Sequence, residues 1–125
     1  MSEASGSTVK LAGWKPQLPP SREECAAMRE VIVQAAVSLT TEGFVSFSLL
    51  ELYRRCQLNV RRKREREEWS YPYRGKRTWD RRVNDAASPK YGAKLVAVTA
   101  GEYRLNPKHY TVHITPTLET AEKEN

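Results

Sequence analysis

The amino-acid sequence predicts an α+β domain of three helices followed by a β-hairpin. Before Pro89, three stretches repeat apolar side chains at spacings of three and four, as one face of an α-helix does. After Pro89 the pattern changes to the alternation typical of β-strands. The chain has 125 residues, so we expect one domain.

The first helix is expected at about 22–41. Ser21 stands at its N-cap and Glu24 follows three residues later, which is the spacing of a capping box. Gly43 supplies a residue that can end the helix with positive φ. The apolar face comprises Cys25, Met28, Ile32, Ala35 and Leu39.

A brief strand is expected at 44–47, followed by a second helix at about 49–57. Ser48 and Glu51 repeat the capping-box spacing at the start of that helix. Because helix propensity stays high in the Arg- and Glu-rich run that follows, the sequence leaves open whether the helix continues through Val60.

The third helix is expected from about Lys76 to Ala87, because Pro72 and Gly75 predict a loop before it. Pro89 ends the helix, since a residue that precedes proline avoids helical geometry. Trp79 is interpreted as a core anchor rather than a stacking platform.

Two short strands at 94–99 and 103–106 predict a hairpin, with its turn at Gly101. We expect Tyr103 and Leu105 to lie in the hairpin core. Segment 109–115 alternates again, and it could form one more strand or an extended tail.

The expected organisation is a Pro-rich arm at 1–20, a domain at 21–107 and a strand or tail at 108–125 with an acidic end. A basic insertion is expected at about 57–75. The N-terminus lacks the apolar core of a signal peptide, and no apolar stretch approaches the ~20 residues that span a bilayer. We therefore expect an intracellular protein, cytoplasmic or nuclear, without membrane association.

The sequence predicts no cofactor and no metal site. Cys25 and Cys56 are interpreted as small buried apolar groups, although a disulfide between them stays open. His109 and His113 lie four residues apart without carboxylate or thiolate company, which is a weak metal signal.

We also expect no enzymatic activity and no catalytic residues. The sequence has no Gly-rich phosphate loop and no GxSxG elbow. Asp80 and Asp85 are expected to point from different sides of one helix, so they do not form the carboxylate cluster of a metal-dependent nuclease.

Charge is distributed very unevenly along the chain. The net charge is +6, but residues 54–94 hold fourteen Lys or Arg against five Asp or Glu, a local balance of +9. The rest of the chain holds seven basic and ten acidic residues. Such asymmetry is typical of a phosphate-binding surface. The signs alternate around Glu65, Glu67 and Glu68, which alone would fit a solvated helix.

The order of the expected elements resembles a winged helix-turn-helix domain over about residues 21–107. "GFVSFSLLELYRRC" resembles the first strand and second helix of such domains, and "RTWDRRVNDAASPKYGAKLVAVTAGEYRLNP" resembles a recognition helix followed by its wing. The sequence departs from this pattern between Cys56 and Lys76, where about twenty residues replace the usual few.

The resemblance implies double-stranded DNA binding, as by a transcriptional regulator or an architectural factor. The recognition helix would read bases, the basic insertion would contact phosphates, and the wing would be flanked by lysines. The expected nucleic-acid-binding residues are Arg61, Arg62, Lys63, Arg64, Arg66, Arg74, Lys76, Arg77, Arg81, Arg82, Asn84, Lys90 and Lys94.

Two alternatives stay open. Winged helices also serve as protein adaptors, and the arm with Trp14 could dock a protein partner. Trp69, Tyr71 and Tyr73 lie among cations, and they could stack on single-stranded DNA or RNA or pin the insertion to the domain. The resemblance also leaves a homodimer open.

Overall fold

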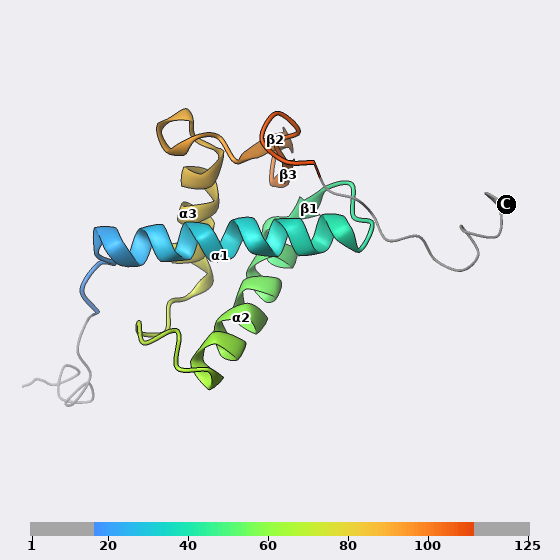
Figure 1. Cartoon of the computed structure of the whole chain (residues 1–125). Helices are drawn as coiled ribbons and strands as arrows, with labels where there is room; N and C mark the ends of the chain where they lie inside the picture. Colours follow the sequence, from blue (N-terminus) through green and yellow to red (C-terminus); the bar gives the residue numbers. More distant parts are fainter. Residues whose placement is uncertain (1–16, 112–125) are drawn as a thin grey trace, which may run out of the picture.

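The computed structural model describes residues 17–111 and has the expected α+β class. Three helices pack against one another, and a small antiparallel sheet lies near the C-terminal end of the first helix (Figure 1). Within residues 17–111, no helix has the length and apolar content needed to cross a membrane. The elements are α1 (Arg22–Thr41), β1 (Phe47–Ser48), α2 (Leu49–Glu65), α3 (Lys76–Ala87), the 3-10 helix η2 (Pro89–Tyr91), β2 (Leu95–Thr99) and β3 (Glu102–Leu105).

Helix α1 begins and ends where the sequence predicts, but its cap differs. The Ser21 hydroxyl accepts a hydrogen bond from the Glu24 backbone N–H at 3.0 Å. The reciprocal bond of a capping box is replaced, because the Glu24 carboxylate binds the Arg74 guanidinium. Met28 and Ile32 are fully buried and centre the helix on the core.

Helix α2 is longer than the 49–57 expected and ends at Glu65. Its capping box is complete: Ser48 accepts from the Glu51 N–H at 3.1 Å, and Glu51 accepts from the Ser48 N–H at 2.8 Å. Val60 is buried one turn beyond Cys56, so the buried stripe continues into the basic run. The insertion predicted at about 57–75 is therefore helical as far as residue 65, and only residues 66–75 connect α2 to α3.

The sheet has three strands in the order β1-β3-β2, all antiparallel. The strand predicted at 44–47 is wrong for its first three residues, because Phe44 and Val45 are exposed and only Phe47–Ser48 pairs with β3. Phe47 lies opposite Tyr103 and is fully buried. The hairpin strands lie within one residue of the predicted ranges.

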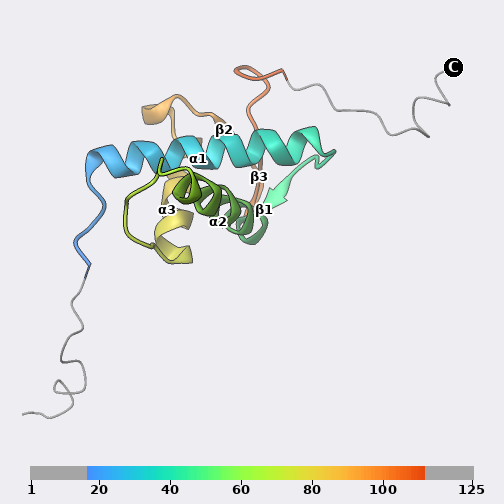
Figure 2. The same ribbon diagram turned by 60° about the horizontal axis from the view of Figure 1, so that its bottom comes forward.

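Helices α2 and α3 lie on the same side of α1 and both pack against it (Figure 2). Helix α3 has the predicted bounds and buries Trp79, Val83 and Ala86. Only 3% of Trp79 is exposed, which confirms the prediction that it anchors the helix to the core.

The predicted arm and the predicted C-terminal strand or tail lie only partly within the described residues. Residues 109–111 form no strand, and the remainder of segment 109–115, with His113, lies outside the described residues. Trp14 lies outside them too. Residues 17–20 have no regular structure, and the Leu18 side chain is 81% exposed.

Candidate nucleic-acid interface

The exposed face of α3 holds three of the predicted residues. Arg77, Arg81 and Asn84 are exposed, and their spacings of four and three set them on the side of the helix opposite Trp79 and Val83. Arg77 and Arg81 form no ion pair with another residue of 17–111. Because the buried stripe fixes the rotation of the helix, this face points away from the core.

One residue of this face, Asn84, is hydrogen-bonded to the sheet. The Tyr103 hydroxyl of β3 donates a hydrogen bond to Asn84 Oδ1 at 2.8 Å. The bond fixes the orientation of the amide and leaves its N–H₂ group free to donate. No local pattern predicts this contact, since the two residues lie nineteen positions apart.

The C-terminal half of α2 carries a second basic group, which lies beside α1. Arg62, Lys63 and Arg66 line a cavity of about 460 Å³ together with Gln34 of α1 and Asn59. Cations and side-chain amides are the groups that most often bind phosphate oxygens. Glu30 lines the same cavity and lowers its positive charge.

Two further arginines of the predicted basic insertion, both on α2, have different surroundings. Arg61 is exposed and forms no ion pair within residues 17–111. Arg64 is exposed as well, but its Nη2 donates to the Tyr71 carbonyl at 2.9 Å. Arg64 therefore helps hold the 66–75 connection against α2.

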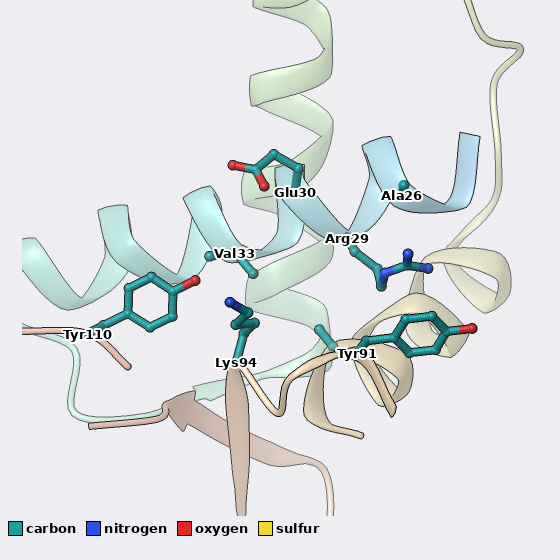
Figure 3. A pocket seen from close by; sticks show the side chains of 8 residues that line it. Ala26, Arg29, Glu30, Val33, Tyr91, Lys94 and Tyr110 are labelled. Carbon is teal, nitrogen blue, oxygen red and sulfur yellow. The ribbon is translucent and has the colours of Figure 1, made fainter. Parts of the chain in front are cut away.

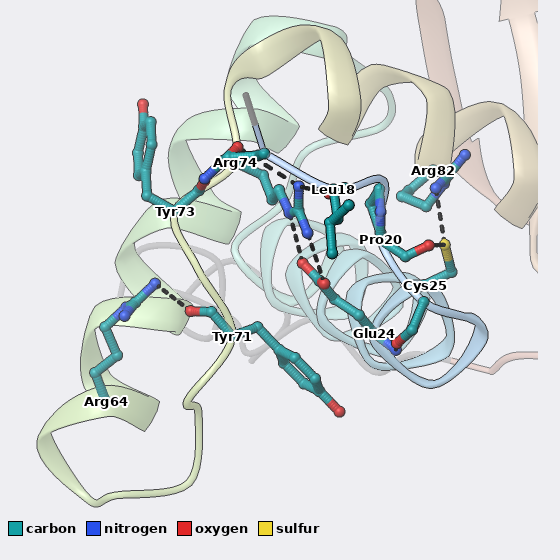
Figure 4. A network of polar contacts seen from close by, with 11 residues as sticks. Leu18, Pro20, Glu24, Cys25, Arg64, Tyr71, Tyr73, Arg74 and Arg82 are labelled. Carbon is teal, nitrogen blue, oxygen red and sulfur yellow. Dashed lines mark hydrogen bonds and ion pairs between the residues drawn. The ribbon is translucent and has the colours of Figure 1, made fainter. Parts of the chain in front are cut away.

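Arg74 lies inside the molecule, which differs from the predicted surface position. Its side chain is 8% exposed and makes two hydrogen bonds to Glu24, at 2.7 and 2.9 Å (Figure 4). A third bond, at 2.8 Å, joins it to the Leu18 carbonyl. The bonds to Glu24 raise the pKa of Arg74. With its donors committed to the protein, Arg74 is not part of the candidate interface.

Three more predicted cations are held by neighbouring carboxylates. Lys76 pairs with Asp80 at 2.8 Å, and Arg66 pairs with Glu68 at 3.1 Å. Arg82 lies 2.9 Å from Asp85, and its Nη1 also donates to the Cys25 sulfur. These residues can contact a polyanion only by giving up or sharing a partner.

The two lysines expected beside the wing lie before it. Lys90 belongs to η2 and is exposed, whereas Lys94 is half-buried and lies immediately before β2. On the hairpin itself the exposed cation is Arg104, which lies opposite Val96. Sequence reasoning missed Arg104, although the alternation of "YRLN" places it on the face away from Tyr103 and Leu105.

The aromatic residues of the connection mostly pack inward. Trp69 is 8% exposed and stacks on Trp79, with ring centroids 6.3 Å apart. Tyr71 packs edge-on against Trp69. Tyr73 is 63% exposed, and its hydroxyl lies 2.9 Å from that of Tyr53. Of the two alternatives, Trp69 therefore pins the connection to the core, and Tyr73 is the aromatic ring left at the surface.

The metal-ligating side chains of the described residues stay dispersed. Within 17–111, no three His, Cys, Asp or Glu side chains meet in a way that could hold a metal ion. Cys25 and Cys56 are free thiols, and burial raises the pKa of Cys56. No protein-family model, curated protein or solved structure matches the chain.

Proposed function

We propose that the protein binds nucleic acid, and duplex DNA in preference, through the exposed face of α3. The observation that supports this most directly is the contrast between the two faces of that helix. Trp79 and Val83 hold one face in the core, while Arg77 and Arg81 extend from the other without a carboxylate partner among residues 17–111.

The proposal includes a winged-helix architecture. The order α1-β1-α2-α3-β2-β3, with β1 added to the hairpin edge, supports it. The connection at 66–75 remains longer than the short turn usual between the second and third helices. Two contacts tie this connection to the helices and help fix where α3 begins: Arg74 bonds Glu24 of α1, and Trp69 stacks on Trp79 of α3.

The chemistry of α3 suits reading in the major groove. Arginine can bond guanine O6 and N7 together, and asparagine can bond adenine N6 and N7. Asn84 is already oriented by Tyr103. Arg61, Arg62 and Lys63 would contact phosphates, which fixes the register of the protein without reading sequence.

Salt dependence of binding tests the proposal. Fluorescence anisotropy would follow a labelled duplex at several salt concentrations, with single-stranded DNA and RNA as competitors. Contacts with about six phosphates give a log–log slope near −5. A flat salt response would contradict nucleic-acid binding, and stronger competition by single strands would contradict the preference for duplex.

A triple variant and a single-charge control locate the phosphate contacts. Replacing Arg61, Arg62 and Lys63 with Ala should weaken binding to all duplexes alike and reduce the slope by about 3. Arg22→Ala is the control, because Arg22 is an exposed cation at the start of α1 and is not among the expected contacts. An equal loss with Arg22→Ala, per charge removed, would mean that only net charge matters.

A second candidate is a protein adaptor, which an exposed apolar groove favours. The groove has a volume of about 280 Å³ and lies between the α1–β1 turn and the end of β3. Phe44, Val45, Pro107 and Tyr110 contribute to its lining. Phe44 is 39% exposed and Val45 is 82% exposed, so two neighbouring apolar side chains meet solvent beside the groove. If titration with nucleic acid detected no binding, the protein-adaptor function would become the favoured proposal.

A further inference from the structure

A separate cavity of about 240 Å³ opens on the side of α1 that faces η2 and the start of β2 (Figure 3). Its apolar lining comes from Ala26, Val33 and Ala86, two of which are buried. The residues proposed to read DNA on α3 do not line it. The cavity is therefore separate from the proposed DNA-binding face.

Two cations line the cavity from different elements. Arg29 of α1 lies over the Tyr91 ring, with its guanidinium carbon 3.9 Å from the ring centroid. The Lys94 ammonium lies 5.9 Å from the centroid of Tyr110. Neither cation forms an ion pair with another residue of 17–111. Each lies near an aromatic ring instead, which restricts its side chain while leaving its charge without a carboxylate partner among the described residues.

One carboxylate also lines the cavity and sets its charge. Glu30 Oε2 accepts a hydrogen bond from Gln34 Nε2 at 3.1 Å. Figure 3 shows the carboxylate turned away from the Arg29 guanidinium. With Arg29, Lys94 and Glu30 ionised, the lining keeps an excess positive charge. The Tyr110 hydroxyl, which points toward the Lys94 side of the cavity in Figure 3, adds a hydrogen-bond donor.

The backbone leaves room for Lys94. Gly92 has φ +90°, and a Cβ at this position would lie 3.0 Å from Lys94 Cε. Glycine therefore both adopts the left-handed conformation and lets the lysine side chain fold across it. The lysine is positioned by the turn after η2 as well as by Tyr110.

We propose that this cavity binds a phosphomonoester of a small organic group. An arginine fork and a lysine point charge together match the oxygens of a dianionic phosphate better than those of a single carboxylate. The alanine and valine lining would cover the organic part. The cavity is smaller than the roughly 300–1,000 Å³ of pockets that take drug-sized ligands, so the organic group must be small.

Titration with phenyl phosphate, with benzoate as the carboxylate analogue, tests the ligand class. Isothermal calorimetry would give the affinities, and backbone NMR shifts would report whether Ala26, Val33 and Ala86 respond. We expect phenyl phosphate to bind and shift these amides, and benzoate to bind at least several times more weakly. Equal binding of both compounds, or shifts confined to other residues, would overturn the proposal.

Three variants complete the test. Arg29→Ala should weaken phenyl phosphate binding about tenfold or more, because a charge-assisted bond is lost. Arg22→Ala, on the same helix outside the cavity, should leave binding unchanged. Glu30→Gln should tighten binding by removing a like charge. Equal weakening by Arg29→Ala and Arg22→Ala would show a diffuse charge effect and reject the site. Duplex binding by Arg29→Ala should stay unchanged, so the two proposals can fail separately.

Discussion

The exposed face of α3 and the 66–75 connection both carry arginine, yet Arg77 on the helix and Arg74 in the connection have opposite surroundings. Arg77 is exposed and unpaired within the described residues, whereas Arg74, three positions earlier, is buried against Glu24. The side-chain type is the same, and only the packing of the surrounding elements differs. A run of positive charge therefore contains residues that stabilise the fold and residues that can meet a partner, and composition does not separate them.

The largest expected effect concerns the helix face that α3 buries. Trp79→Ala should lower the free energy of unfolding by about 3–5 kcal/mol, because it leaves a cavity beside Trp69. Small domains have only about 5–15 kcal/mol in total, so thermal unfolding should shift strongly. Tyr73→Ala, which removes an exposed ring, serves as the control. An unchanged melting curve for Trp79→Ala would refute the placement of α3.

Removing Arg74 should cost nearly as much stability. Arg74→Ala leaves the Glu24 carboxylate buried without its partner, which we expect to cost about 3 kcal/mol in urea unfolding. The double variant Glu24→Gln/Arg74→Met should recover part of the loss. Duplex affinity of the folded fraction should not change. If Arg74→Ala weakened DNA binding while stability stayed constant, the contrast between the two regions would be wrong.

On the exposed face of α3 the expected effect is on binding rather than stability. Arg81→Ala should cost about 1–3 kcal/mol of binding free energy and relax the preference at one base position. The melting temperature should stay near that of the unmodified protein, since Arg81 is exposed. A panel of duplexes with single-position changes would measure this, and no effect on any of them would exclude base reading by Arg81.

The smallest effect concerns an ion pair at the surface. Glu42 accepts hydrogen bonds from Arg55 at 2.6 and 2.9 Å, and these hold the pKa of Glu42 below its usual value. The folded state therefore binds the proton less readily than the unfolded chain. The stabilisation is present above the unfolded pKa and is lost as the pH falls through the lower folded pKa. Glu42→Gln should flatten the pH dependence of stability in that acid range, as urea unfolding at several pH values would show.

Local patterns predicted most of the fold. Helices α1 and α3 have the bounds that caps, apolar spacing and Pro89 indicate, because these signals act within a few residues. The sequence left the length of α2 open because local charge pattern and tertiary packing both determine where this helix ends. Alternating charge permits a helix, but only the burial of Val60 against the core decides that it continues.

The candidate site was less predictable because its distinctions depend on distant neighbours. Periodicity indicates that Arg77, Arg81 and Asn84 share a face of α3, and the structure has that arrangement. The bond of Arg74 to Glu24 spans fifty residues, and a local pattern contains no information about it. The cavity beside Arg29 and Lys94 likewise joins residues of α1, α3 and η2 with Lys94 and Tyr110, so its lining follows only from packing.

The bond between Arg74 and Glu24 also bears on the order in which the chain folds. Helices α1 and α2 can form from local contacts. The Arg74–Glu24 bond, which holds the chain just before α3, must instead close a loop of fifty residues. Closing such a loop lowers the entropy of the chain, and this cost is offset only by the contacts of the completed core. We expect α3 to dock late, so that Arg74→Ala accelerates unfolding while it leaves the folding rate nearly unchanged. Stopped-flow measurements would show the opposite pattern if the connection formed in the folding nucleus.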